Sequence, residues 1–116
     1  MFLAALALDT DSHRAVAAYL FGIAAECALK VVASQLAGGR AKDIQRVHFP
    51  DLRIALRRLP VGRKSAELRR LVESDSFMNQ WAIDIRYSRK EDIKEKQVAT
   101  WRENARAALR TMEGWA

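Results

Sequence analysis

Residues 13–36 read HRAVAAYLFGIAAECALKVVASQL, and this long apolar stretch decides the fold. The N-cap residues Asp9–Ser12 precede it and Gly38-Gly39 follow it, which predicts one helix from His13 to about Leu36. So few of its positions are polar that such a helix has to be buried on more than one side. We therefore expect it to be the central helix of a bundle, or to serve a subunit interface as well.

One set of apolar positions in this helix recurs at helical spacing and is predicted to be a buried stripe. Cys27 lies on it and is predicted to be a small core residue, because no adjacent cation would favour a thiolate. Glu26 and Lys30 are expected to form an i,i+4 ion pair on the face that stays in water. The stripe consists of Val16, Leu20, Ile23, Cys27, Val31 and Ser34.

The rest of the chain also has helical periodicity, and no useful length alternates with period two. A second helix is predicted from Pro50 to the breaker 60–62, and a third from near Ser65. Residues 74–76 are expected to cap a new helical segment that reaches Tyr87, and the last helix to run from about Asp92 to the end. Trp81, Trp101 and Trp115 are predicted to be core or interface residues. The fold class predicted is all-α, an antiparallel bundle of four to five helices.

Length and composition fit a single domain over residues 1–116, with residues 1–8 as the end or remnant of an N-terminal helix. That apolar opening has no basic residue before it and no export-type cleavage region after it. The uncharged run Ala15–Ala25 is about half of the ~20 residues that a membrane span needs. The single cysteine cannot form an intrachain disulfide. A cytoplasmic protein without membrane insertion is expected.

The formal net charge of +6 is concentrated in one quarter of the chain. Residues 40–70 hold ten basic and three acidic side chains, whereas residues 1–39 have a net charge of −1 and residues 71–116 balance to zero. The excess predicts either a solvated helix face or a binding site for RNA phosphates or an acidic protein surface. The candidate anion-binding residues in this segment are Arg53, Arg57, Arg58, Arg63 and Lys64.

Three segments resemble the HEPN family, named for higher eukaryotes and prokaryotes nucleotide-binding. The stretch YLFGIAAECALK at residues 19–30 is similar to the first core helix of that family. His48–Arg53 resembles the entry into its second helix, and Trp81–Tyr87 is similar to a WxxxxRY variant of its third helix. The resemblance covers roughly residues 10–115. It implies a bundle of four or five helices that forms a homodimer, with a cleft along the subunit interface.

Active members of the family are metal-independent endoribonucleases that use an Arg-x4–6-His motif. Arg86 occupies the place of the motif arginine, with Tyr87 beside it, but Glu91–Ile93 stand where the histidine should be. No histidine follows His48, which is instead expected to tether the loop before the second helix. Arg86 has a simpler alternative role as a structural ion-pair partner. The departure favours a protein without the ribonuclease activity of the family.

Three functions follow as hypotheses. The first is a noncatalytic HEPN-like homodimer that binds a partner, such as the antitoxin-like component of a toxin–antitoxin or defence system. The second is an RNA-binding protein or a degenerate endoribonuclease, which would use the basic segment together with Arg86. The third is a nucleotide or small-ligand-binding bundle, although the chain has no Gly-rich phosphate loop. No metal site and no cofactor is predicted, because no Cys/His cluster has metal-ligand spacing.

Overall fold

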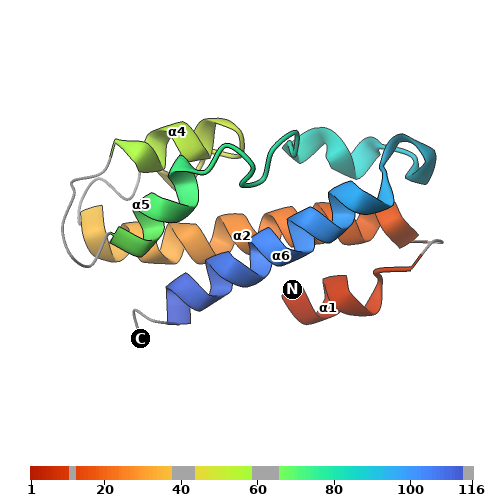
Figure 1. Cartoon of the computed structure of the whole chain (residues 1–116), viewed down its shortest axis with the longest axis horizontal. Helices are drawn as coiled ribbons and strands as arrows, with labels where there is room; N and C mark the ends of the chain where they lie inside the picture. Colours follow the sequence, from red (N-terminus) through yellow and green to blue (C-terminus); the bar gives the residue numbers. More distant parts are fainter. Residues whose placement is uncertain (11–12, 38–43, 59–65, 114–116) are drawn as a thin grey trace.

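The structure is a computed structural model that describes residues 1–10, 13–37, 44–58 and 66–113. Helix α2 (Arg14–Ala37) runs along the long axis of a molecule measuring 42 × 23 × 22 Å, and α6 (Glu95–Glu113) packs against it and crosses it obliquely (Figure 1). Within the described residues every regular element is a helix, as predicted. The remaining elements are α1 (Phe2–Ala7), α4 (Asp51–Arg57), α5 (Ala66–Glu73) and the 3-10 helices η4 (Ile83–Tyr87) and η5 (Lys90–Asp92).

The central helix α2 forms where the sequence predicts it and packs most extensively against α6. Its buried side is built mainly from alanines, whose short side chains allow neighbouring segments to approach closely. On α6 the buried residues recur at intervals of three and four, which gives one face along the helix. The buried residues of α2 are Ala17, Ala18, Phe21, Gly22, Ala24, Ala25, Glu26, Ala28, Leu29, Val32 and Ala33.

The short helix α1 packs against the N-terminal half of α2, so residues 2–7 are helical. The rings of Phe2 and Phe21 are 5.7 Å apart between centroids. The guanidinium of Arg106, on α6, lies 5.4 Å from the centroid of the Phe2 ring, a cation–π contact. Through Phe2, α1 thus joins the two long helices.

Helices α4 and α5 pack against each other at the end of the bundle that holds the C-terminus of α2 (Figure 1). Pro50 is the N-cap of α4, and Leu52 and Leu56 are buried. Leu68 and Val72 of α5 are buried as well. The predicted breakers 38–39 and 60–62 and the predicted helix start at Ser65 lie outside the described residues.

The helix predicted from residues 74–76 to Tyr87 is wrong over its first half. Residues 75–80 form turns, and Met78 and Gln80 have positive φ values of 50° and 66°. The N–H of Met78 donates to Asn104 Oδ1 at 2.6 Å instead of to a helical carbonyl. Helical structure resumes only as η4, and the last helix begins at Glu95 rather than near Asp92.

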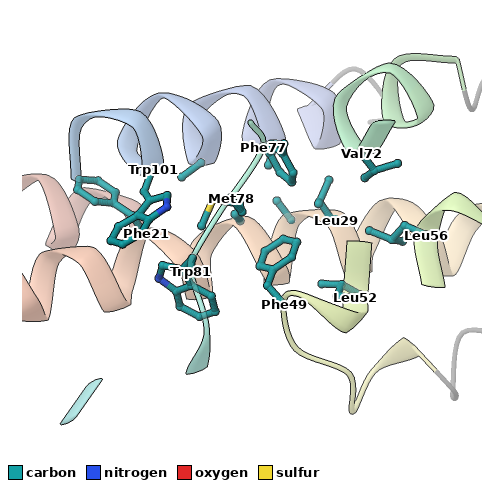
Figure 2. Close-up of a cluster of buried hydrophobic side chains, with 14 of the residues drawn as sticks. Phe21, Leu29, Phe49, Leu52, Leu56, Val72, Phe77, Met78, Trp81 and Trp101 are labelled. Atoms are coloured by element: carbon teal, nitrogen blue, oxygen red, sulfur yellow. The ribbon is translucent and has the colours of Figure 1, made fainter. Parts of the chain in front are cut away.

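The irregular segment still delivers its apolar side chains to the core (Figure 2). Trp81 is 1% exposed, and its indole N–H donates to the Ala18 carbonyl of α2 at 2.9 Å. Trp101 of α6 is also buried, and its indole N–H donates to the carbonyl of Asn79 at 3.0 Å. Both tryptophans are core residues, as predicted, whereas Trp115 lies outside the described residues.

Candidate functional site

A buried carboxylate on α2 holds the loop that leads into α4. Glu26 is 2% exposed, and one of its carboxylate oxygens lies 2.8 Å from His48 Nδ1. The other oxygen accepts the backbone N–H of Phe49 at 2.8 Å. The predicted tether by His48 is confirmed, and its partner is Glu26.

The ion pair predicted between Glu26 and Lys30 is wrong. Glu26 points into the core, where a charge is tolerated only if it is hydrogen-bonded. Lys30, one turn further along α2, donates to the backbone carbonyl of Gln45 at 3.0 Å. Two successive turns of α2 therefore hold the same loop, the first through a carboxylate and the second through an ammonium group.

One turn before Glu26, Gly22 gives room for the indole of Trp81. A Cβ atom built at Gly22 would lie 1.8 Å from the Trp81 ring. Tyr19 stacks on the same ring at 6.5 Å between centroids, and Phe49 meets it edge-on at 6.0 Å. Gly22, Glu26 and Lys30 lie four residues apart, so the connecting segments cross α2 along a single line of positions.

The side of α2 beside this line is apolar and largely uncovered. Val16 is 48% exposed and Val31 is 44% exposed. Cys27 is exposed, and Leu20 and Ile23 are only partly buried. We call Val16, Leu20, Ile23, Cys27 and Val31 the α2 stripe. The prediction that these positions are the buried face, with Cys27 in the core, is wrong because the alanine side of the helix faces its neighbours.

By length and composition alone, residues Arg14–Gln35 of α2 would also be long and apolar enough to cross a membrane. About 56% of the most apolar window is buried inside the bundle, and the core helix of a soluble protein passes the same test. The feature that needs explanation is therefore the uncovered α2 stripe rather than the hydropathy of the whole helix.

The predicted anion-binding residues of the basic segment lie in different environments. Arg53 donates to the carbonyl of Phe77 at 2.9 Å, and Arg57 donates through Nε to the carbonyl of Val72 at 2.8 Å. Both guanidinium groups thus hold α4 against the end of α5 and the turn after it. Arg58 is exposed at the C-cap of α4. Arg63 and Lys64 lie outside the described residues.

The basic segment contains two more exposed arginines that the sequence did not single out as site residues. Arg46 lies in the loop before His48, and Arg70 lies in the last turn of α5. Arg70 also lines a cleft of about 280 Å³ together with Glu67, Ser74 and Thr111. Their position within residues 40–70 was the one sequence signal that could have indicated them. Whether an arginine is exposed depends on tertiary packing, which cannot be read from the sequence.

The motif arginine, Arg86, lies in η4, which packs against α2. Its side chain is outside the part of the structure that is described. The neighbouring Tyr87 is 74% exposed, as expected for a residue at the edge of the bundle. Of the positions where the family has its histidine, Glu91 and Asp92 are exposed and Ile93 is buried. Residues 91–93 thus offer two carboxylates and an apolar side chain rather than an imidazole.

A second polar cleft, of about 280 Å³, lies between the start of α2 and the first half of α6. Arg14 pairs with Glu95 at 3.1 Å, and Arg102 pairs with Asp9 at 2.6 Å. Each of these arginines is therefore matched by a carboxylate within the cleft. Among the described residues no group of three or more His, Cys, Asp or Glu side chains could hold a metal ion.

Comparison with protein-family models, with curated proteins and with solved structures found no match to this chain.

Proposed function

We propose that this chain is a noncatalytic binding module of the HEPN type that acts as a homodimer. The observation that carries the proposal is the α2 stripe, a row of apolar side chains on the longest helix that the rest of the chain covers only in part. Apolar stripes of this kind are typical of subunit interfaces. The carboxylates and the isoleucine in place of the motif histidine support the noncatalytic part of the proposal.

Solution mass tests the assembly. At tens of micromolar we expect the mass of two chains, and Val31→Glu should weaken dimerisation by at least about tenfold, or ~1.4 kcal/mol, because each copy would bury an unpaired carboxylate. Ile54→Glu is the matched control, since Ile54 is 48% exposed on α4 and lies off the stripe. A strict monomer, or equal effects of both variants, contradicts the proposal.

The bound partner would be a protein that functions with this one, as in a toxin–antitoxin or defence pair. Co-expression with proteins encoded beside it, followed by purification of the complex, tests this part. We expect one such protein to copurify with the wild-type chain. If only the homodimer is recovered in each co-expression, the neighbouring proteins do not bind it, and this part of the proposal is contradicted.

A second candidate function, RNA binding, is favoured by the exposed arginines of the basic segment. Arg46, Arg58 and Arg70 are exposed, whereas Arg53 and Arg57 are hydrogen-bonded to backbone carbonyls. Binding to single-stranded RNA should therefore weaken with salt, and Arg58→Ala should lower the slope of log K against log salt by about 0.7. A flat salt response, or no binding at low salt, contradicts this function.

Residual cleavage is a separate question within this second function. Pure protein incubated with mixed RNA in EDTA should leave the RNA intact if the module is noncatalytic. Degradation that is lost in Arg86→Ala would overturn the noncatalytic assignment, whereas equal degradation by both proteins would reveal a contaminant. A thermal-shift screen with mononucleotides tests the nucleotide-binding alternative, for which stabilisation of the fold is the expected sign.

A further inference from the structure

The geometry of α2 points to a specific arrangement of the proposed homodimer, and this inference rests on the proposed function. We infer that two copies pair through their α2 stripes in antiparallel orientation, with the two-fold axis crossing the helix beside Ile23. The stripe spans residues 16–31, which is about 22 Å along a helix that rises 1.5 Å per residue. Two stripes overlap along their whole length only if the axis passes through the middle of this span.

The stripe is self-complementary in that arrangement. A two-fold interface is made by the same patch on both copies, so each residue has to fit the residue that the axis brings opposite it. With the axis beside Ile23, Val16 lies opposite Val31 of the second copy. Leu20 lies opposite Cys27 of the second copy, so a large side chain meets a small one. At the centre, Ile23 meets its own counterpart.

Charge favours a second copy over an acidic partner on this surface. The stripe itself is uncharged, and residues 1–39 together have a net charge of only −1 in a chain of +6. An acidic partner would be recognised by exposed cations, and on the described part of the chain those of the basic segment belong to α4, α5 and the loop before α4. The stripe is where two copies of a basic chain can approach with little repulsion.

Charge also favours the antiparallel orientation over the parallel one. The loop at 44–50 is held by Glu26 and Lys30, so the basic segment lies over the C-terminal half of α2 (Figure 1). Its described part holds six arginines and two acidic residues. A parallel pair would place both segments at one end. An antiparallel pair in this register moves them apart along the axis, with about 8 Å between the two Glu26 positions and about 20 Å between the two Lys30 positions, against a screening length of ~8 Å in physiological salt. Antiparallel helix dipoles add to this preference.

The single cysteine makes the arrangement measurable by oxidative crosslinking. In an antiparallel pair, Cys27 lies about 10 Å along the axis from its counterpart, which exceeds the 4.4–6.8 Å between Cα atoms that a disulfide spans. Ile23 lies only about 1.5 Å along the axis from its counterpart. We therefore expect Ile23→Cys in a Cys27→Ser background to crosslink at least about tenfold faster than the wild type.

A mixing experiment provides a second test that does not depend on the half-buried Ile23. Val16→Cys and Val31→Cys, each in the Cys27→Ser background, should not crosslink alone but should crosslink when the two proteins are mixed. Both positions are nearly half exposed, so the substitutions leave the fold intact. If the wild-type protein and both single variants each crosslink on their own, and mixing gives no gain, the pair is parallel and the inference is overturned.

The outcomes separate this inference from the proposed function. A dimer by solution mass whose stripe cysteines do not crosslink in any combination would place the interface elsewhere and overturn the inference while the homodimer stands. A monomer by mass overturns both. A monomer that also binds vesicles of phosphatidylcholine through Val31, as judged by Val31→Glu, would assign the stripe to a lipid surface instead.

Discussion

Helix α2 carries mostly alanines, with Phe21, Leu29 and Val32, on the side that faces its neighbours, and valine, leucine, isoleucine and cysteine on the side that they cover only in part. By hydropathy alone the second side is the better core face, because its side chains are larger on average. The bundle buries the first side because the α6 helix and the Trp81 indole need close approach to the α2 backbone. Close approach, rather than side-chain size, thus decided which side became the core.

The largest effect is expected on the covered side, at Gly22. Gly22→Ala places a methyl group about where the Trp81 ring lies, so the indole or the helix has to move. We expect a loss of roughly 3 kcal/mol in the free energy of unfolding, at the upper end of overpacking costs. Chemical denaturation followed by circular dichroism measures it. Helix propensity alone would make Gly22→Ala stabilising by up to about 1 kcal/mol, so an unchanged or increased stability would contradict the steric account.

A somewhat smaller loss is expected at the buried carboxylate. Glu26→Ala removes the acceptor of the Phe49 N–H and of the His48 ring, and it leaves a cavity in place of the side chain. The expected cost is about 2 kcal/mol, since a buried donor is left unsatisfied. Glu26→Gln keeps one acceptor oxygen and should cost less. If Glu26→Ala and His48→Ala cost the same, the bond to Phe49 contributes nothing and the clamp is weaker than described.

The two neighbouring arginines at the end of α4 should behave differently. Arg57→Ala removes the hydrogen bond to the Val72 carbonyl and should cost about 1–2 kcal/mol of stability. Arg58→Ala should change stability by less than about 0.5 kcal/mol, because Arg58 is an exposed surface residue. Thermal unfolding of both variants decides the point. Equal losses would show that the contact between α4 and α5 does not depend on Arg57.

The smallest effect on stability is expected on the uncovered side. Cys27→Ser should change the free energy of unfolding by less than about 0.5 kcal/mol, whereas a buried cysteine would be costly to replace with a polar residue. The thiol should also react with a disulfide reagent without denaturant. If the stripe pairs as inferred, labelling slows as protein concentration rises. Slow labelling at every protein concentration would indicate that the Cys27 thiol is buried in the core.

For several residues of the candidate site, the sequence predicted the role but not the residue that each one contacts. The tether by His48 followed from its place before a capped helix, and the burial of Trp81 followed from its spacing. The choice of Glu26 as the partner of His48 depends on a loop that returns to α2 over 22 residues of chain. Glu26 and Lys30 were assigned to each other because local i,i+4 spacing is visible in a sequence and long-range contacts are not.

The sequence by itself determined the all-α class, the extent of α2 and the approximate places of α4, α5 and α6, because caps, breakers and helical periodicity act over a few residues. It also determined where the charge lies along the chain. Only the tertiary structure decided which side of α2 is buried, that residues 75–80 turn instead of continuing a helix, and which arginines hold backbone carbonyls. These outcomes depend on contacts between segments far apart in the chain, where the space left beside a glycine or an alanine outweighs local preference.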